Sequence, residues 1–169
     1  MAAGPTFEPI ATQTLASAAA TITFNSIGAT YTDLRLVLTG TVASTAPDVW
    51  IRFNSDTATN YSSTTIQGNG TAASSFAITS ATKIDITPGV GWSATIPSMV
   101  TTDIFSYAGS TNKTVLANES ADRNGSGVTT STVGLWRSTA AITRIDITNS
   151  GSVNFAIGTT ATLYGIKAA

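Results

Sequence analysis

Short segments in which apolar and polar residues alternate recur along the whole chain. Within Leu34–Leu38 the leucines occupy every second position, and Val49–Phe53 shows the same alternation. Because successive side chains of a β-strand point to opposite faces, a period of two gives each segment one apolar face. No segment of useful length has the 3.6-residue period of a helix. The pattern predicts an all-β protein.

Turn-forming pairs such as Asn69-Gly70 and Pro88-Gly89 separate these segments. Ala58–Ile66 is predicted to be a short helix or an irregular loop, and Gly68–Ser75 a flexible loop. Short strands at even spacing are typical of a β-sandwich or barrel. The predicted strands are Leu15–Phe24, Thr32–Val42, Val49–Asn54, Phe76–Ile78, Lys83–Thr87, Met99–Tyr107, Lys113–Asn118, Val128–Trp136, Ile142–Thr148, Val153–Ile157 and Thr160–Ile166.

The composition supports strands joined by polar loops and offers little catalytic chemistry. Thr, Ser and Ala supply 32, 19 and 25 of the 169 residues, and there is no Cys and no His. Threonine suits a pleated, half-buried surface. Without His or Cys, nucleophilic triads of the usual kind and ordinary zinc sites are not available. We therefore expect a structural protein without enzymatic activity or a cofactor.

The low charge of the chain bears on its partners. Only 10% of the residues are charged and the net charge is −1, with the basic residues scattered singly. A nucleic-acid-binding protein needs a basic patch, so nucleic-acid binding is not expected. A small domain near zero net charge has little electrostatic protection against association. We expect an oligomer.

The N-terminus and the hydropathy pattern bear on location. Met1–Pro5 lacks the basic and long apolar regions of a secretion signal, and no apolar run approaches the length of a membrane span. We expect a protein without a signal peptide and without a membrane partner.

Carboxylates are the remaining chemical groups. The nine acidic residues are spread along the chain, so nothing supports the paired carboxylates of a glycosidase, although two of them could meet in the fold. Oxygen ligands cluster in Asn54–Asn60 and Asn118–Gly125, but neither segment has the spacing of an EF-hand. Capping of loops by Asp and Asn is the simpler interpretation, and no metal site is predicted.

Aromatic residues are candidates for contacts. Trp92 lies in a predicted loop, where a large exposed ring would favour a subunit contact, and Tyr61 could join it in stacking on a sugar. Burial of the same rings in the core is the alternative. Trp50 alternates against an apolar face and is expected to point outward.

Five blocks of sequence, read in order, resemble small virion proteins of tailed bacteriophages, including cyanophages. The blocks are Phe7–Leu15, Ile22–Leu36, Ile51–Ser62, Trp136–Ile147 and Asn154–Ile166. The resemblance implies an antiparallel, jelly-roll-like β-sandwich, a homotrimer, and assembly into the virion in the host cytoplasm. No catalytic motif comes with it. The domain would span residues 11–169, preceded by an extended N-terminal arm of residues 1–10.

Two functions follow as expectations from the resemblance. The first is a capsid decoration or cement protein that binds the major capsid protein and stabilises its lattice. In this case the N-terminal arm would bind a neighbouring subunit through Pro5, Phe7 and Pro9. An edge strand within the chain's own sheet is an equal alternative for the arm. The second is a tail- or head-fibre module that recognises host surface glycan through Tyr61 and Trp92.

Overall fold

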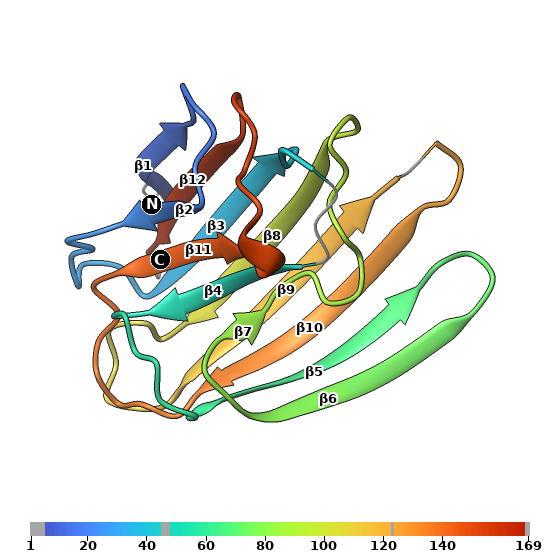
Figure 1. The fold of residues 1–169 in the computed structure, drawn as a ribbon. Helices are drawn as coiled ribbons and strands as arrows, with labels where there is room; N and C mark the ends of the chain where they lie inside the picture. The colour runs from blue at the N-terminus through green and yellow to red at the C-terminus, as the bar shows by residue number, and fades with distance from the viewer. Residues whose placement is uncertain (1–5, 45–47, 123, 168–169) are drawn as a thin grey trace.

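The chain folds into two antiparallel β-sheets that pack face to face (Figure 1). The computed structural model describes residues 6–44, 48–122 and 124–167. Within these ranges the larger sheet has eight strands in the order β1-β12-β3-β8-β9-β10-β5-β6. The smaller sheet has four strands in the order β2-β11-β4-β7. The prediction of an all-β antiparallel sandwich is confirmed.

The strands of the larger sheet are β1 (Phe7–Thr14), β12 (Thr160–Ile166), β3 (Asp33–Gly40), β8 (Ser98–Phe105), β9 (Lys113–Ala121), β10 (Val128–Trp136), β5 (Tyr61–Gly68) and β6 (Ala73–Ala81). Those of the smaller sheet are β2 (Thr21–Phe24), β11 (Ile145–Asn149), β4 (Val49–Phe53) and β7 (Ile84–Asp85). A single 3-10 turn, η1 (Ser150–Ser152), follows β11.

Eight of the strands have the jelly-roll order. When the hairpins β5–β6 and β9–β10 are set aside, β1-β12-β3-β8 faces β2-β11-β4-β7. The chain then crosses from one sheet to the other at every connection except the one from β4 to β7, as in a double Greek key. The two hairpins are insertions that extend the larger sheet past β8. The smaller sheet leaves the end of this extension uncovered (Figure 1).

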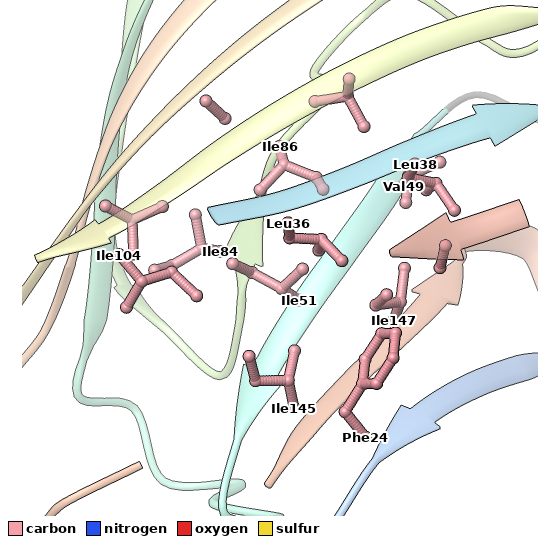
Figure 2. Packing of buried hydrophobic residues seen from close by; sticks show 14 of the residues in the cluster. Phe24, Leu36, Leu38, Val49, Ile51, Ile84, Ile86, Ile104, Ile145 and Ile147 are labelled. Carbon is pink, nitrogen blue, oxygen red and sulfur yellow. The ribbon is translucent and has the colours of Figure 1, made fainter. Parts of the chain in front are cut away.

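The core lies between the two sheets, where the predicted apolar faces meet. Leu36 and Leu38 of β3 are fully buried, as are Ile51 of β4 and Ile147 of β11. Figure 2 shows these side chains packed together with neighbours from both sheets. Full burial of one such side chain stabilises the fold by about 1.5–3 kcal/mol. The alternation along the strands therefore determines which sheet face is buried.

Four local predictions differ from the structure. Leu15–Phe24, predicted as one strand, forms a strand only over Thr21–Phe24, which is β2. The segment predicted as a short helix or loop, Ala58–Ile66, contains most of strand β5. The predicted flexible loop Gly68–Ser75 contains the end of β5, a tight turn in which the Asn69 amide donates to Ala72 O over 3.2 Å, and the start of β6. Val153–Ile157 forms no strand, and only Phe155 makes isolated bridges, to Ala19 and Val42.

The described part of the expected N-terminal arm belongs to the sheet. Strand β1 pairs with β12 in a register that places Phe7 opposite Ile166. Phe7 and Pro9 therefore lie in an edge strand of the chain's own sheet, which is the alternative to binding a neighbouring subunit. Residues 1–5, and with them Pro5, lie outside the described residues. In the part of the chain that is described, no helix has the length and apolar character needed to cross a membrane.

Candidate association surfaces and buried polar groups

Trp92 is buried, which corrects the expectation of an exposed ring. It lies in the loop between β7 and β8 and has no exposed surface. Its ring packs edge-on against Phe155 with 6.2 Å between centroids, and its indole Nε1 donates to Glu119 Oε1 over 3.0 Å. The loop places this ring in the core, so Trp92 cannot contact a partner or a sugar in this conformation.

Tyr61 is buried at the other end of the sandwich. It begins β5, stacks on Trp136 with 6.1 Å between ring centroids, and accepts a hydrogen bond from the Phe53 amide at 3.2 Å. Burial raises the pKa of its hydroxyl to about 12. Tyr61 is therefore a core residue. Both aromatic side chains that were expected to stack on a host glycan, Tyr61 and Trp92, are buried. Trp50 is half-buried, with the Lys83 ammonium 2.8 Å from the centre of its ring.

Glu119 is a buried carboxyl group on the inner face of β9. Its two oxygens accept hydrogen bonds from Trp92 Nε1 and from Thr130 Oγ1, the latter at 3.3 Å. Burial is the largest influence on this carboxyl and raises its pKa to about 8, above neutrality. Glu119 therefore holds a proton at neutral pH and acts as a polar core group.

Asp48 and Asp85 form a half-buried pair, with their carboxyls within hydrogen-bonding reach of each other. Burial raises the pKa of both. Each also binds backbone of the loop that follows β7: Asp48 accepts from the Gly89 amide at 2.7 Å, and Asp85 accepts from the Thr87 amide at 3.1 Å. These contacts order the loop that contains Trp92. Among the described residues, no group of three or more acidic side chains could hold a metal ion.

In both oxygen-rich segments, Asn54–Asn60 and Asn118–Gly125, an aspartate accepts hydrogen bonds from its own loop. Asp56 accepts from the Ala58 amide at 2.9 Å, from Asn60 Nδ2 at 2.8 Å and from Trp136 Nε1 at 2.7 Å. In the second segment Asp122 accepts from the Gly125 amide at 2.9 Å. Such bonds are the Asx-type caps that the composition favours.

The solvent side of the eight-stranded sheet, here called the outer face, is a broad open surface. One row of paired residues crosses all eight strands of this sheet. In order they are Pro9, Tyr164, Arg35, Asp103, Leu116, Val133, Thr64 and Ala77. Large apolar side chains are exposed on the same face at Phe7, Ile66, Met99, Phe105 and Val133.

The outer face has little net charge. Arg35 binds Asp103 on the next strand through two parallel bonds of 2.6 and 2.7 Å, and the Arg35 guanidinium lies 5.6 Å from the centre of the Phe7 ring. Phe7 and Pro9 are exposed here, next to that pair. Of the four candidate interface residues that lie within the described ranges, these two remain accessible for a contact.

A shallow hollow of about 590 Å³ lies where β5, β8, β9 and β10 end. Its lining includes Gly68, Met99, Ser120, Asp122 and Thr129. The described lining residues include one charged side chain and no aromatic ring. The hollow therefore lacks the stacking platform that a sugar site commonly uses.

Comparison with protein-family models gives no match, and a search of curated proteins gives none either.

Proposed function

We propose that the chain is a structural protein of a virion, a decoration or cement protein that binds the capsid of a tailed bacteriophage. It would act through contacts with the major capsid protein and with copies of itself, without a cofactor and without catalysis. The outer face supports this proposal most, because it is broad and nearly neutral and exposes several large apolar side chains.

The outer face has the dimensions of a protein interface. Eight strands at roughly 4.8 Å spacing, each about eight residues long, give a surface of about 34 Å by 27 Å. A standard interface takes about 800 Å² from each partner, so this face is large enough for one. The paired Arg35 and Asp103 leave no uncompensated charge between them to be desolvated there.

The jelly-roll fold is compatible with a capsid protein and with a sugar-binding protein. Jelly rolls occur in viral capsid domains and in lectins, and fold alone does not assign a function. A lectin-like function would favour exposed aromatic rings, whereas Tyr61 and Trp92 are buried. The resemblance to tailed-phage virion proteins favours the capsid, and with it a homotrimer assembled in the host cytoplasm.

The decisive measurement is the copy number of the chain per particle, by quantitative mass spectrometry of purified virions scaled to the major capsid protein. A simple ratio to the capsid subunit, with hundreds of copies, is the expected result. A few to a few dozen copies would overturn the cement proposal and favour host recognition at the tail or a vertex.

A variant tests the outer face directly. Val133→Lys introduces a charge near the middle of the outer face, and we expect it to abolish binding to capsids that lack the protein. Ser17→Lys is the matched control, because Ser17 is exposed in the loop between β1 and β2. If Val133→Lys bound as well as Ser17→Lys, the outer face would not be the capsid-binding surface.

A further inference from the structure

The two sheets have four edge strands, and three of them have features that discourage pairing with another chain. Strand β1 contains Pro9 and a register shift just after it. Strand β2 has four residues and β7 has two, directly after Lys83. Short strands, proline and charged residues are the usual protections of a sheet edge.

Strand β6 has none of these protections over most of its length. It has nine residues, and every side chain from Ala73 to Ser80 is exposed. No charged residue and no proline occurs from Tyr61 to Thr82. A register shift against β5 lies only at its C-terminal end, where Ser80 has a φ of 56°. The regular part of β6 is a long, neutral and open edge.

Two apolar side chains of β6 lie on the inner side of the larger sheet. Phe76 pairs with Thr65 and Ile78 pairs with Ser63, and both partners on β5 are buried toward the sandwich. The smaller sheet ends at β7 and does not reach β6, so Phe76 and Ile78 remain 36% and 39% exposed. The β5–β6 hairpin extends past the smaller sheet (Figure 1), and this chain alone leaves the apolar surface of Phe76 and Ile78 open.

The sequence of β6 is nearly palindromic about Ala77. Phe76 and Ile78 flank Ala77, Ser75 and Thr79 come next, then Ser74 and Ser80, and finally Ala73 and Ala81. In an antiparallel pair centred on Ala77, each residue would meet one of its own size and polarity. Self-complementarity of this kind is what a two-fold contact between identical chains requires.

We propose that β6 pairs antiparallel with β6 of a second copy of this chain, about a two-fold axis at Ala77, and so joins two larger sheets into one. Phe76 of each copy then packs on Ile78 of the other, on the side where both smaller sheets lie. The free backbone groups of both edges become paired. Because β6 has no charged residue, the two-fold axis brings no like charges together.

This contact goes beyond the proposed function and does not depend on it. A strand of a different protein could also pair with the β6 edge, but such a contact would not explain why the β6 sequence is nearly palindromic. If the chain forms trimers through another surface and the two-fold axes at Ala77 cross the three-fold axis at right angles, the β6 contacts join two trimers. In either case, breaking it halves the mass of the assembly.

The first test is the mass of the purified chain by light scattering coupled to gel filtration. Ala77→Lys places two like charges at the axis, and we expect the mass to fall by half. Ser131→Lys is the matched control: Ser131 is equally exposed on the outer face, but on β10, two strands from the edge. We expect it to keep the mass of the unmodified chain.

The second test uses the absence of cysteine from the chain. Paired Cα atoms in antiparallel strands lie about 4.5–5.5 Å apart, within the range that a disulfide spans. Ala77→Cys should therefore cross-link rapidly to a covalent dimer under mild oxidation, and Ser131→Cys should not. Because Ala77→Cys is a small change at an exposed position, it keeps the proposal testable even if Ala77→Lys misfolds.

Either of two results overturns the proposal. One is a monomer, or an assembly whose mass Ala77→Lys leaves unchanged although the variant is folded. The other is cross-linking of Ala77→Cys no faster than that of Ser131→Cys. Both results would leave the copy number in virions, and with it the proposed function, unaffected.

Discussion

At the scale of single residues, the buried carboxyl of Glu119 gives the fold an unusual dependence on pH. Burial raises its pKa to about 8, whereas the unfolded chain returns it to the ordinary value near 4.5. Between these values the unfolded state releases a proton that the folded state retains. The contribution of Glu119 to stability is therefore fully present below pH 4.5, and it falls by up to about 1.4 kcal/mol per pH unit as the pH rises toward 8.

The first prediction is that the free energy of unfolding by denaturant is larger at pH 5 than at pH 8. Asp85 acts in the same direction, because burial also raises its pKa. Glu119→Gln keeps the shape of the side chain but cannot ionise, and it should flatten much of the pH dependence. A stability that is constant or rises from pH 5 to pH 8 would contradict this account of Glu119.

The second prediction concerns the close approach of β7 to β10. A Cβ atom on Gly134 would lie 2.7 Å from Cγ2 and 2.9 Å from Cδ1 of Ile84. Gly134→Ala should therefore destabilise the protein by about 1–3 kcal/mol through overpacking. The check is a double-mutant cycle with Ile84→Ala, which removes the opposing atoms, so that Gly134→Ala costs less in that background. Equal costs in both backgrounds would show that the contact is not the cause.

At the scale of elements, β6 is the least covered strand of the larger sheet. It pairs on one side only, and both of its faces are exposed, whereas β8 and β9 are paired on both sides. Local opening is easiest where few apolar contacts are lost. The third prediction is that, in the Ala77→Lys variant, amide hydrogens of β6 exchange with solvent much faster than those of β8.

Hydrogen exchange followed by mass spectrometry of peptides checks this prediction. In the unmodified chain the proposed β6 contact should slow exchange in β6, while β8 serves as the internal reference in both samples. Protection of β6 equal to that of β8 in a monomeric variant would mean that something other than the contact holds the strand.

Most strands could be predicted from the alternation of apolar residues. Val128–Trp136 and Thr160–Ile166 coincide with β10 and β12. In β12 the buried Ala161 and Leu163 alternate with outward residues, and the pattern records that directly. The buried face of β10 contains Thr130 and Thr132, and its β-branched residues rather than an apolar face indicate the strand. Strand β5 also buries polar side chains, Ser63 and Thr65, and its Ser-rich sequence favoured a loop or a short helix instead.

The environments of Tyr61 and Trp92 could not be predicted in the same way. Alternation within a strand indicates which side faces the core, but a loop has no such period. Trp92 is buried because Asp48, 41 residues before Gly89, binds its loop, and because Glu119, 27 residues after Trp92, accepts its indole hydrogen. Such long-range contacts leave no local signal in the sequence.

At the scale of the whole molecule, the jelly roll brings the two ends of the described chain together. Strands β1 and β12 are neighbours, and the Lys167 amide donates to Thr6 O over 3.0 Å. The Lys167 ammonium also binds the Glu8 carboxylate at 2.7 Å. Adjacent ends of this kind make circular permutation possible.

The fourth prediction is that joining the two termini by a flexible linker and opening the chain between Gly125 and Ser126 preserves the fold. Both residues are exposed in the turn between β9 and β10. Opening between Val90 and Gly91 is the matched control, because that loop is buried and holds Trp92 against Glu119.

Circular dichroism and thermal unfolding of the two permutants measure the outcome. The first should keep cooperative unfolding close to that of the parent chain, because its new ends disturb only an exposed turn. The second should unfold at a much lower temperature, since its new ends place charged groups beside the buried indole. If both permutants unfolded at the same temperature, the loop between β7 and β8 would not be an essential part of the core. That result would contradict the role assigned here to its contacts with Asp48, Asp85 and Glu119.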